Sequence, residues 1–171
     1  MTNKVYQIGE SDITWLSSGG SAVLTLTSLA AGAGRQGARH DFGVITTARA
    51  HLFDWWFFCK FATAPVVGEQ IDIYWKGYHQ GGTHAMNDDG NTDAAVSAQD
   101  KLKNLIFLGS LIVDEASATP EFAVGNHSEP VWLPHRYGMP VIWNATTDAL
   151  SATATDHGFI LTPVIPQAQN T

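Results

Sequence analysis

The stretch HLFDWWFFCKF, residues 51–61, is the most aromatic run of the chain and decides its fold class. A β-strand points successive side chains to opposite faces of its sheet. One face of this stretch is almost wholly apolar and consists of the odd-numbered residues His51, Phe53, Trp55, Phe57, Cys59 and Phe61. We therefore predict a strand whose odd-numbered face forms the core, with His51 as a hydrogen-bonded core histidine.

The opposite face of residues 51–61 mixes the aromatic side chains Trp56 and Phe58 with two charged residues. The next strand-like run, EQIDIYWKGY (69–78), shows the same division, because Tyr74 and Tyr78 alternate with charged residues on one of its faces. Aromatic residues interleaved with a few charges are typical of protein interfaces. We predict that Trp56, Phe58, Tyr74 and Tyr78 contact another protein chain. The alternative is that the long connection at 77–99 covers this face from within the same chain.

The rest of the sequence repeats short strand-like runs between Gly, Pro, Asn and Asp residues. These runs are 12–16, 22–29, 69–75, 103–115, 121–125, 130–134, 139–146 and 157–165. A short helix or turn is expected only around 91–102. The pattern predicts an all-β fold, a two-sheet antiparallel sandwich that is jelly-roll-like because its strand spacing is irregular. We expect one domain over 1–171, with an extended N-terminal arm at 1–11 and a C-terminal tail at 166–171.

Residues 103–115, KNLIFLGSLIVDE, differ from the other strand candidates because both of their faces are apolar. Leu105, Phe107 and Leu111 fall on one face, whereas Ile106 and Ile112 fall on the other. Such a strand is either central in the fold or part of a subunit contact.

Charge and cysteine content limit the possible partners. The chain has 9 Lys and Arg against 16 Asp and Glu, a net charge of −7, so it lacks the basic footprint of a nucleic-acid-binding protein. Only 15% of residues are charged and 44% are apolar, which favours a protein whose surface is bound to partner proteins. The single cysteine, the absence of a secretory signal and the absence of a membrane-spanning run predict synthesis and folding in a cytoplasm, without a membrane partner.

The strongest polar motif is NDDGNTD, residues 87–93, in which Asp89, Asn91 and Asp93 alternate as in a calcium-binding loop. Ala94 stands where such a loop needs glycine, and Asp-Gly sequences are ordinary turn formers. We predict a solvated turn, with these three residues as weak cation candidates and no cofactor.

The glycine-rich segment AGAGRQG, residues 31–37, has neither the Lys-Ser/Thr end of a phosphate-binding loop nor a following helix, so we predict a hairpin connection. Arg35 and Arg39 beside it are candidates to bind a carboxylate of a partner. No serine-nucleophile motif and no close histidine pair of the zinc type occurs, so no catalytic residue is predicted.

The order of these segments resembles small virion structural proteins of tailed bacteriophages, in particular jelly-roll-type capsid decoration or cement proteins. The resemblance rests on Trp15, GGSAVLTLTSLAAGAGRQGARHDFG (19–43), the aromatic strand, EQIDIYW (69–75), DDGNTDAA (88–95), LIFLGSLIVDE (105–115) and MPVIWNATTDALSAT (139–153). It implies a non-enzymatic protein, made in the host bacterial cytoplasm, that forms a homotrimer on the capsid surface. There it would clamp neighbouring copies of the major capsid protein through several contacts at once.

Two other functions remain open. A carbohydrate-binding module would present exposed aromatic rings in a planar row, and Trp75, Trp132 and Trp143 are the residues to inspect. A cupin-like metal enzyme would need at least three histidines or acids to converge inside the sandwich.

Overall fold

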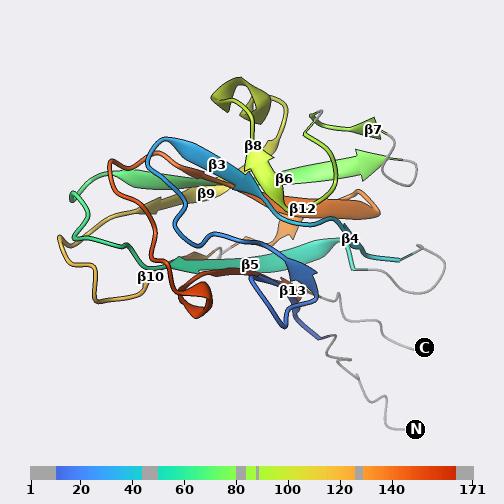
Figure 1. Cartoon of the computed structure of the whole chain (residues 1–171). Helices are drawn as coiled ribbons and strands as arrows, with labels where there is room; N and C mark the ends of the chain where they lie inside the picture. The colour runs from blue at the N-terminus through green and yellow to red at the C-terminus, as the bar shows by residue number, and fades with distance from the viewer. Residues whose placement is uncertain (1–10, 44–49, 80–83, 88, 126–128, 165–171) are drawn as a thin grey trace, which may run out of the picture.

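The computed structural model describes residues 11–43, 50–79, 84–87, 89–125 and 129–164. Two β-sheets are stacked face to face (Figure 1). Sheet A contains β1 (Ile13–Leu16), β2 (Ala22–Val23), β5 (Leu52–Cys59), β10 (Phe122–Gly125), β11 (Val131–Trp132) and β13 (Gly158–Pro163). Sheet B contains β3 (Ala33–Gln36), β4 (His40–Asp41), β6 (Gln70–His79), β7 (His84–Ala85), β8 (Ala94–Val96), β9 (Ile106–Ile112) and β12 (Tyr137–Asn144).

The strand pairing has the nested order of a jelly roll. β1 pairs with β13, β3 with β12, β5 with β10 and β6 with β9, all antiparallel. The pairs β5–β13 and β6–β12 then join these ladders into the two sheets. Eight strands that pair from the outside inward in this way form two Greek keys. The predicted jelly-roll-like antiparallel sandwich is therefore confirmed.

The core lies between the sheets and is built from aromatic rings. The odd-numbered residues of β5 point into it as predicted, with Trp55 4% and Phe57 0% exposed. Trp15 from β1 meets Trp75 from β6 edge to face, at 5.6 Å between ring centroids. Such perpendicular contacts bury large rings at favourable electrostatic geometry.

His51 does not belong to this core. It precedes β5, is partly exposed, and its ring stacks on Trp132 at a centroid distance of 5.1 Å. Its Nδ1 atom has no hydrogen-bond partner. The prediction of a hydrogen-bonded core histidine is wrong, because Trp132 pairs with Leu52 at the end of β5, where the sandwich meets solvent.

A second apolar cluster lies on the outer face of sheet B. The segment that carries β8 and the short 3-10 helix η3 (Gln99–Leu102) folds over this face and packs Val96 and Leu102 against Trp143 (Figure 1). Trp143 fits closely because Gly34 opposes it, and a Cβ atom at Gly34 would lie 2.6 Å from the indole ring. The short helix or turn predicted around 91–102 is η3.

The other helical segment is η4 (Ala154–Asp156), which precedes β13. Within the described ranges, neither helical segment has the length or the apolar run that a membrane span requires. The predicted arm at 1–11 and tail at 166–171 fall, except for Ser11, outside the described residues.

Candidate assembly interface

The outer face of β6 is covered by a loop of the same chain, residues 89–93. Tyr78 is 2% exposed and Lys76 is fully buried, although the alternation of β6 directs both away from the sandwich core. The prediction of Tyr78 as an interface residue is wrong, because its side chain is buried within the chain and its hydroxyl donates to the Gly90 carbonyl. For this part of the face, the alternative of an intrachain cover is the correct one.

Three side chains of sheet B hold this loop by its carbonyl oxygens. The Lys76 ammonium donates hydrogen bonds to Gln36 Oε1 at 3.0 Å and to the Gly90 carbonyl at 2.7 Å. The Tyr78 hydroxyl also donates to the Gly90 carbonyl, and burial raises the pKa of Tyr78. Gln36 Nε2 donates to the carbonyls of Asp89 and Thr92, each at 2.9 Å. The loop carbonyls therefore accept from an ammonium, a hydroxyl and an amide of the same chain.

Three of the four carboxylate oxygens of Asp89 and Asp93 have hydrogen-bond partners within the chain, and Asp89 Oδ2 is buried without one. Both oxygens of Asp93 bind Arg35, at 2.9 Å to Nε and 2.6 Å to Nη2. Burial alone would raise the pKa of Asp93, but the hydrogen bonds from Arg35 and Thr25 lower it. Asp89 Oδ1 accepts from the Ser97 hydroxyl at 2.7 Å, and Asn91 accepts a backbone hydrogen bond from the Arg39 amide at 3.0 Å. In the part of the chain that is described, no three His, Cys, Asp or Glu side chains are grouped to hold a metal ion.

The two arginine candidates are engaged inside the molecule. The carboxylate partner of Arg35 is Asp93 of its own chain, so the expected partner carboxylate is already supplied. The bond to Asp93 raises the pKa of Arg35. The guanidinium of Arg39 lies over the Tyr137 ring at 4.7 Å and near the Tyr78 ring at 5.9 Å. Both arginines therefore help to fix the loop that covers sheet B.

Trp56 and Phe58 lie on the outer face of sheet A and are partly exposed. The Phe58 ring rests on Gly158 of the neighbouring β13 strand, where a Cβ atom would come within 2.6 Å of both Phe58 and Leu16. Local packing therefore accounts for part of this aromatic surface. The role of Trp56 and Phe58 in contacts with another chain stays a prediction.

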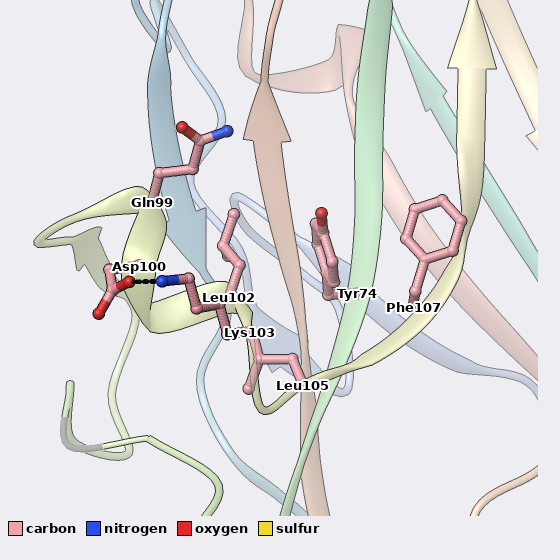
Figure 2. A pocket seen from close by; sticks show the side chains of 7 residues that line it. All are labelled: Tyr74, Gln99, Asp100, Leu102, Lys103, Leu105 and Phe107. Atoms are coloured by element: carbon pink, nitrogen blue, oxygen red, sulfur yellow. Dashed lines mark ion pairs between the residues drawn. The ribbon is translucent and has the colours of Figure 1, made fainter.

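Tyr74 is the predicted interface residue that lies beside an open hollow. Its ring meets Phe107 of β9 edge to face, at 5.3 Å between centroids. Figure 2 shows both rings on one side of a hollow of about 530 Å³, with η3 on the other side. At its rim Lys103 forms an exposed ion pair with Asp100.

The most exposed apolar feature is β9 itself. Phe107 is 56% exposed and Ile112 is 64% exposed, although both pair with β6 in a ladder whose register shifts once, between Phe107 and Gly109. Two further hollows lie along β9, one of about 430 Å³ at Leu108–Ser110 and one of about 350 Å³ at its Ile112 end. The three hollows follow β9 from its first residues to its last.

β9 is an edge strand of sheet B. It pairs with β6 on one side, and no strand among the described residues pairs with it on the other. The other strands at the sheet edges, β2, β7, β8, β10 and β11, have two to four residues, whereas β9 has seven. The two apolar faces of residues 103–115 predicted either a central strand or a subunit contact. The position of β9 at the edge of its sheet excludes a central strand. Phe107 and Ile112 were not among the predicted interface residues, although the two-faced pattern of their strand was the signal for them.

The residues named for the alternative functions are distributed as follows. Trp75 is 1% and Trp143 is 8% exposed, so neither can stack on a sugar, whereas Trp132 is 57% exposed. His157 is buried, and its Nε2 atom donates to the Ser151 carbonyl at 2.9 Å. His79, His84 and His127 lie outside the residues whose side chains are described.

In comparisons with known proteins, no family model, no curated protein and no solved structure matches this chain.

Proposed function

We propose that this chain is a non-catalytic virion structural protein, a capsid decoration protein that binds further copies of itself and the major capsid protein on the capsid surface. The observation that carries the proposal is the free edge of β9, a seven-residue strand with two large exposed apolar side chains, Phe107 and Ile112. The resemblance implies a homotrimer, whereas the β9 edge by itself supports self-association without fixing the number of copies.

The physical argument starts from what monomeric β-proteins do with their edges. A free edge presents unpaired N–H and C=O groups, and monomers blunt it with short strands, charged residues, proline or a covering loop. Residues 106–112, IFLGSLI, contain no charge and no proline. An edge strand of this composition is a site for pairing with another chain, which is what an assembly protein needs.

The capsid setting is supported by the jelly-roll topology together with the resemblance in segment order. A decoration protein binds the capsid tightly because a symmetric oligomer makes several modest contacts at once. The partly exposed Trp56 and Phe58 on sheet A would supply a second contact surface, on the sheet opposite to β9. Two separate surfaces allow one copy to bind a neighbour and the capsid together.

Sedimentation equilibrium of the purified chain tests the assembly proposal. We expect a stable oligomer, and we expect Phe107→Ser combined with Ile112→Ser to dissociate it. The matched control is Trp132→Ser, which removes from sheet A an aromatic side chain that is 57% exposed, close to the 56% of Phe107. A wild-type chain that stays monomeric at all concentrations would contradict the proposal.

The gene neighbourhood tests the virion setting independently. We expect genes for a major capsid protein and a portal protein beside the gene for this chain. A neighbourhood of carbohydrate-degrading enzymes would favour the sugar-binding alternative, for which the exposed Trp132 is the one specific observation.

A further inference from the structure

We infer that β9 pairs antiparallel with β9 of a second copy, about a two-fold axis through the middle of the strand, so that sheet B continues from one copy into the next. This inference rests on the proposed function, because it specifies the self-contact that the proposal requires. It identifies the occupant of the β9 edge as a second copy of this chain.

The first argument is the availability of the strand. β9 pairs with β6 along one side, from Ile106 to Ile112, and within the described ranges no strand forms a ladder with its second side, although β10 of sheet A lies near it. A seven-residue edge can form a ladder of several backbone hydrogen bonds with an incoming strand. The two- to four-residue strands at the other sheet edges cannot form a ladder of that length.

The second argument is charge complementarity, which selects the orientation. The strand itself is neutral, but Lys101 and Lys103 precede it and Asp114 and Glu115 follow it. Lys103, Asp114 and Glu115 are exposed. In a two-fold antiparallel pair, the basic end of each copy meets the acidic end of the other. A parallel arrangement would instead bring like charges together at both ends.

The third argument concerns the apolar surface along the edge. Phe107 and Ile112 lie near opposite ends of β9, and hollows flank each of them. A two-fold axis at the middle of the strand superposes the Phe107 end of one copy on the Ile112 end of the other. The exposed side chains of each copy would then cover the apolar surface of its partner.

The fourth argument is closure. A two-fold contact is isologous, so each copy uses the β9 edge, and no other edge strand among the described residues is longer than four residues. Association through this edge therefore stops at two copies and does not continue into a fibre. A trimer would need a different surface, and its observation with β9 unprotected would overturn this inference while leaving the proposed self-assembly intact.

A charge-exchange experiment tests the orientation. We expect Lys103→Glu to raise the dimer dissociation constant at least about tenfold, because the new carboxylate meets Asp114 and Glu115 at both symmetric ends. Asp114→Lys combined with Glu115→Lys is expected to have a similar effect. The triple variant is expected to restore dimerisation, because the exchanged charges again oppose each other. Failure of the triple variant to restore the affinity would overturn the antiparallel pairing.

Two controls separate folding and general charge effects from the contact itself. Lys103 loses only its exposed ion pair with Asp100, and exposed pairs of this kind add little to stability, so the single variant is expected to fold. Asp12→Lys is expected to leave the dissociation constant unchanged. It places a positive charge beside β1, which belongs to sheet A, whereas β9 belongs to sheet B.

Amide hydrogen exchange locates the contact directly. We expect the β9 amides to exchange more slowly at high than at low protein concentration, while the amides of β1 and β8 show no such dependence. Concentration-dependent association without added protection at β9 would overturn the inference but support assembly through another surface. A chain that neither associates nor gains protection would contradict the inference and the proposed function together.

Discussion

The adjacent residues Trp55 and Trp56 point to opposite faces of one strand, so the same substitution has different consequences at the two positions. Trp55 is 4% exposed in the core, and we expect Trp55→Ala to cost about 3–5 kcal/mol of unfolding free energy. Trp56 lies on the partly exposed outer face of sheet A, and Trp56→Ala is expected to cost about 1 kcal/mol. Urea unfolding of both variants measures the difference. Equal losses would show that the outer face of sheet A is packed as tightly as the core.

His157 gives the native state a defined response to acid. The ring is buried, and burial lowers its pKa below the ordinary value of 6.5, even though the bond to the Ser151 carbonyl acts in the opposite direction. The unfolded chain therefore takes up the proton first as the pH falls. Stability from neutral His157 is complete above pH 6.5 and is lost as the pH falls through 6.5 toward the lowered native pKa.

We therefore expect His157→Gln to flatten the pH dependence of the melting temperature between about pH 7.5 and about pH 5. Glutamine retains an N–H donor for the Ser151 carbonyl but does not titrate. His40, whose pKa burial also lowers, remains in the variant and accounts for part of the remaining slope. Calorimetry at several pH values makes the comparison, and an unchanged slope would contradict the assignment to His157.

The buried ammonium of Lys76 holds the loop over sheet B. Removal of this group should loosen the loop without unfolding the domain. Lys76→Met fills similar space but removes the ammonium donor of the Gly90 carbonyl, which keeps the Tyr78 hydroxyl and a long hydrogen bond of 3.4 Å from Gln36 Nε2. We expect faster amide exchange in residues 89–92 and a loss of about 1–3 kcal/mol of stability. The β5 amides serve as the internal reference. Unchanged exchange in the loop would show that Lys76 does not hold it.

The sequence predicts the direction of side chains along a strand better than it predicts what covers them. The period of two in residues 51–61 places Phe53 and Trp55 in the core because that period is a property of the backbone. Tyr78 resembles an interface residue in sequence, but residues 89–93 of the same chain cover it. A strand face has the same amphipathic pattern whether a loop of its own chain or a partner chain covers it. The local sequence therefore cannot show which of the two is the cover.

The position of a strand in its sheet is equally non-local. Residues 103–115 carry apolar side chains on both faces, a pattern shared by central strands and contact strands. The nested pairing of the jelly roll puts β9 at the edge, because β9 pairs with β6 and the other side of β6 is already joined to β12. Chain order, rather than the composition of β9, therefore exposes Phe107 and Ile112.

At the scale of the whole molecule, assembly and folding are coupled by mass action. If two native copies bind each other and unfolded chains do not, association stabilises the native state and the melting temperature rises with protein concentration. For a domain of this size, a hundredfold increase in concentration is expected to raise the melting temperature by roughly 3–5 °C. Differential scanning calorimetry over that range measures the shift.

The variants distinguish this coupling from ordinary stability changes. Phe107→Ser combined with Ile112→Ser removes exposed apolar groups, so it should abolish the concentration dependence while changing the melting temperature of the dilute protein little. Trp132→Ser, on sheet A, should preserve the concentration dependence. If the Phe107 and Ile112 variant kept the full concentration dependence, association would have to use another surface. The partly exposed outer face of sheet A, with Trp56 and Phe58, would then be the first surface to test.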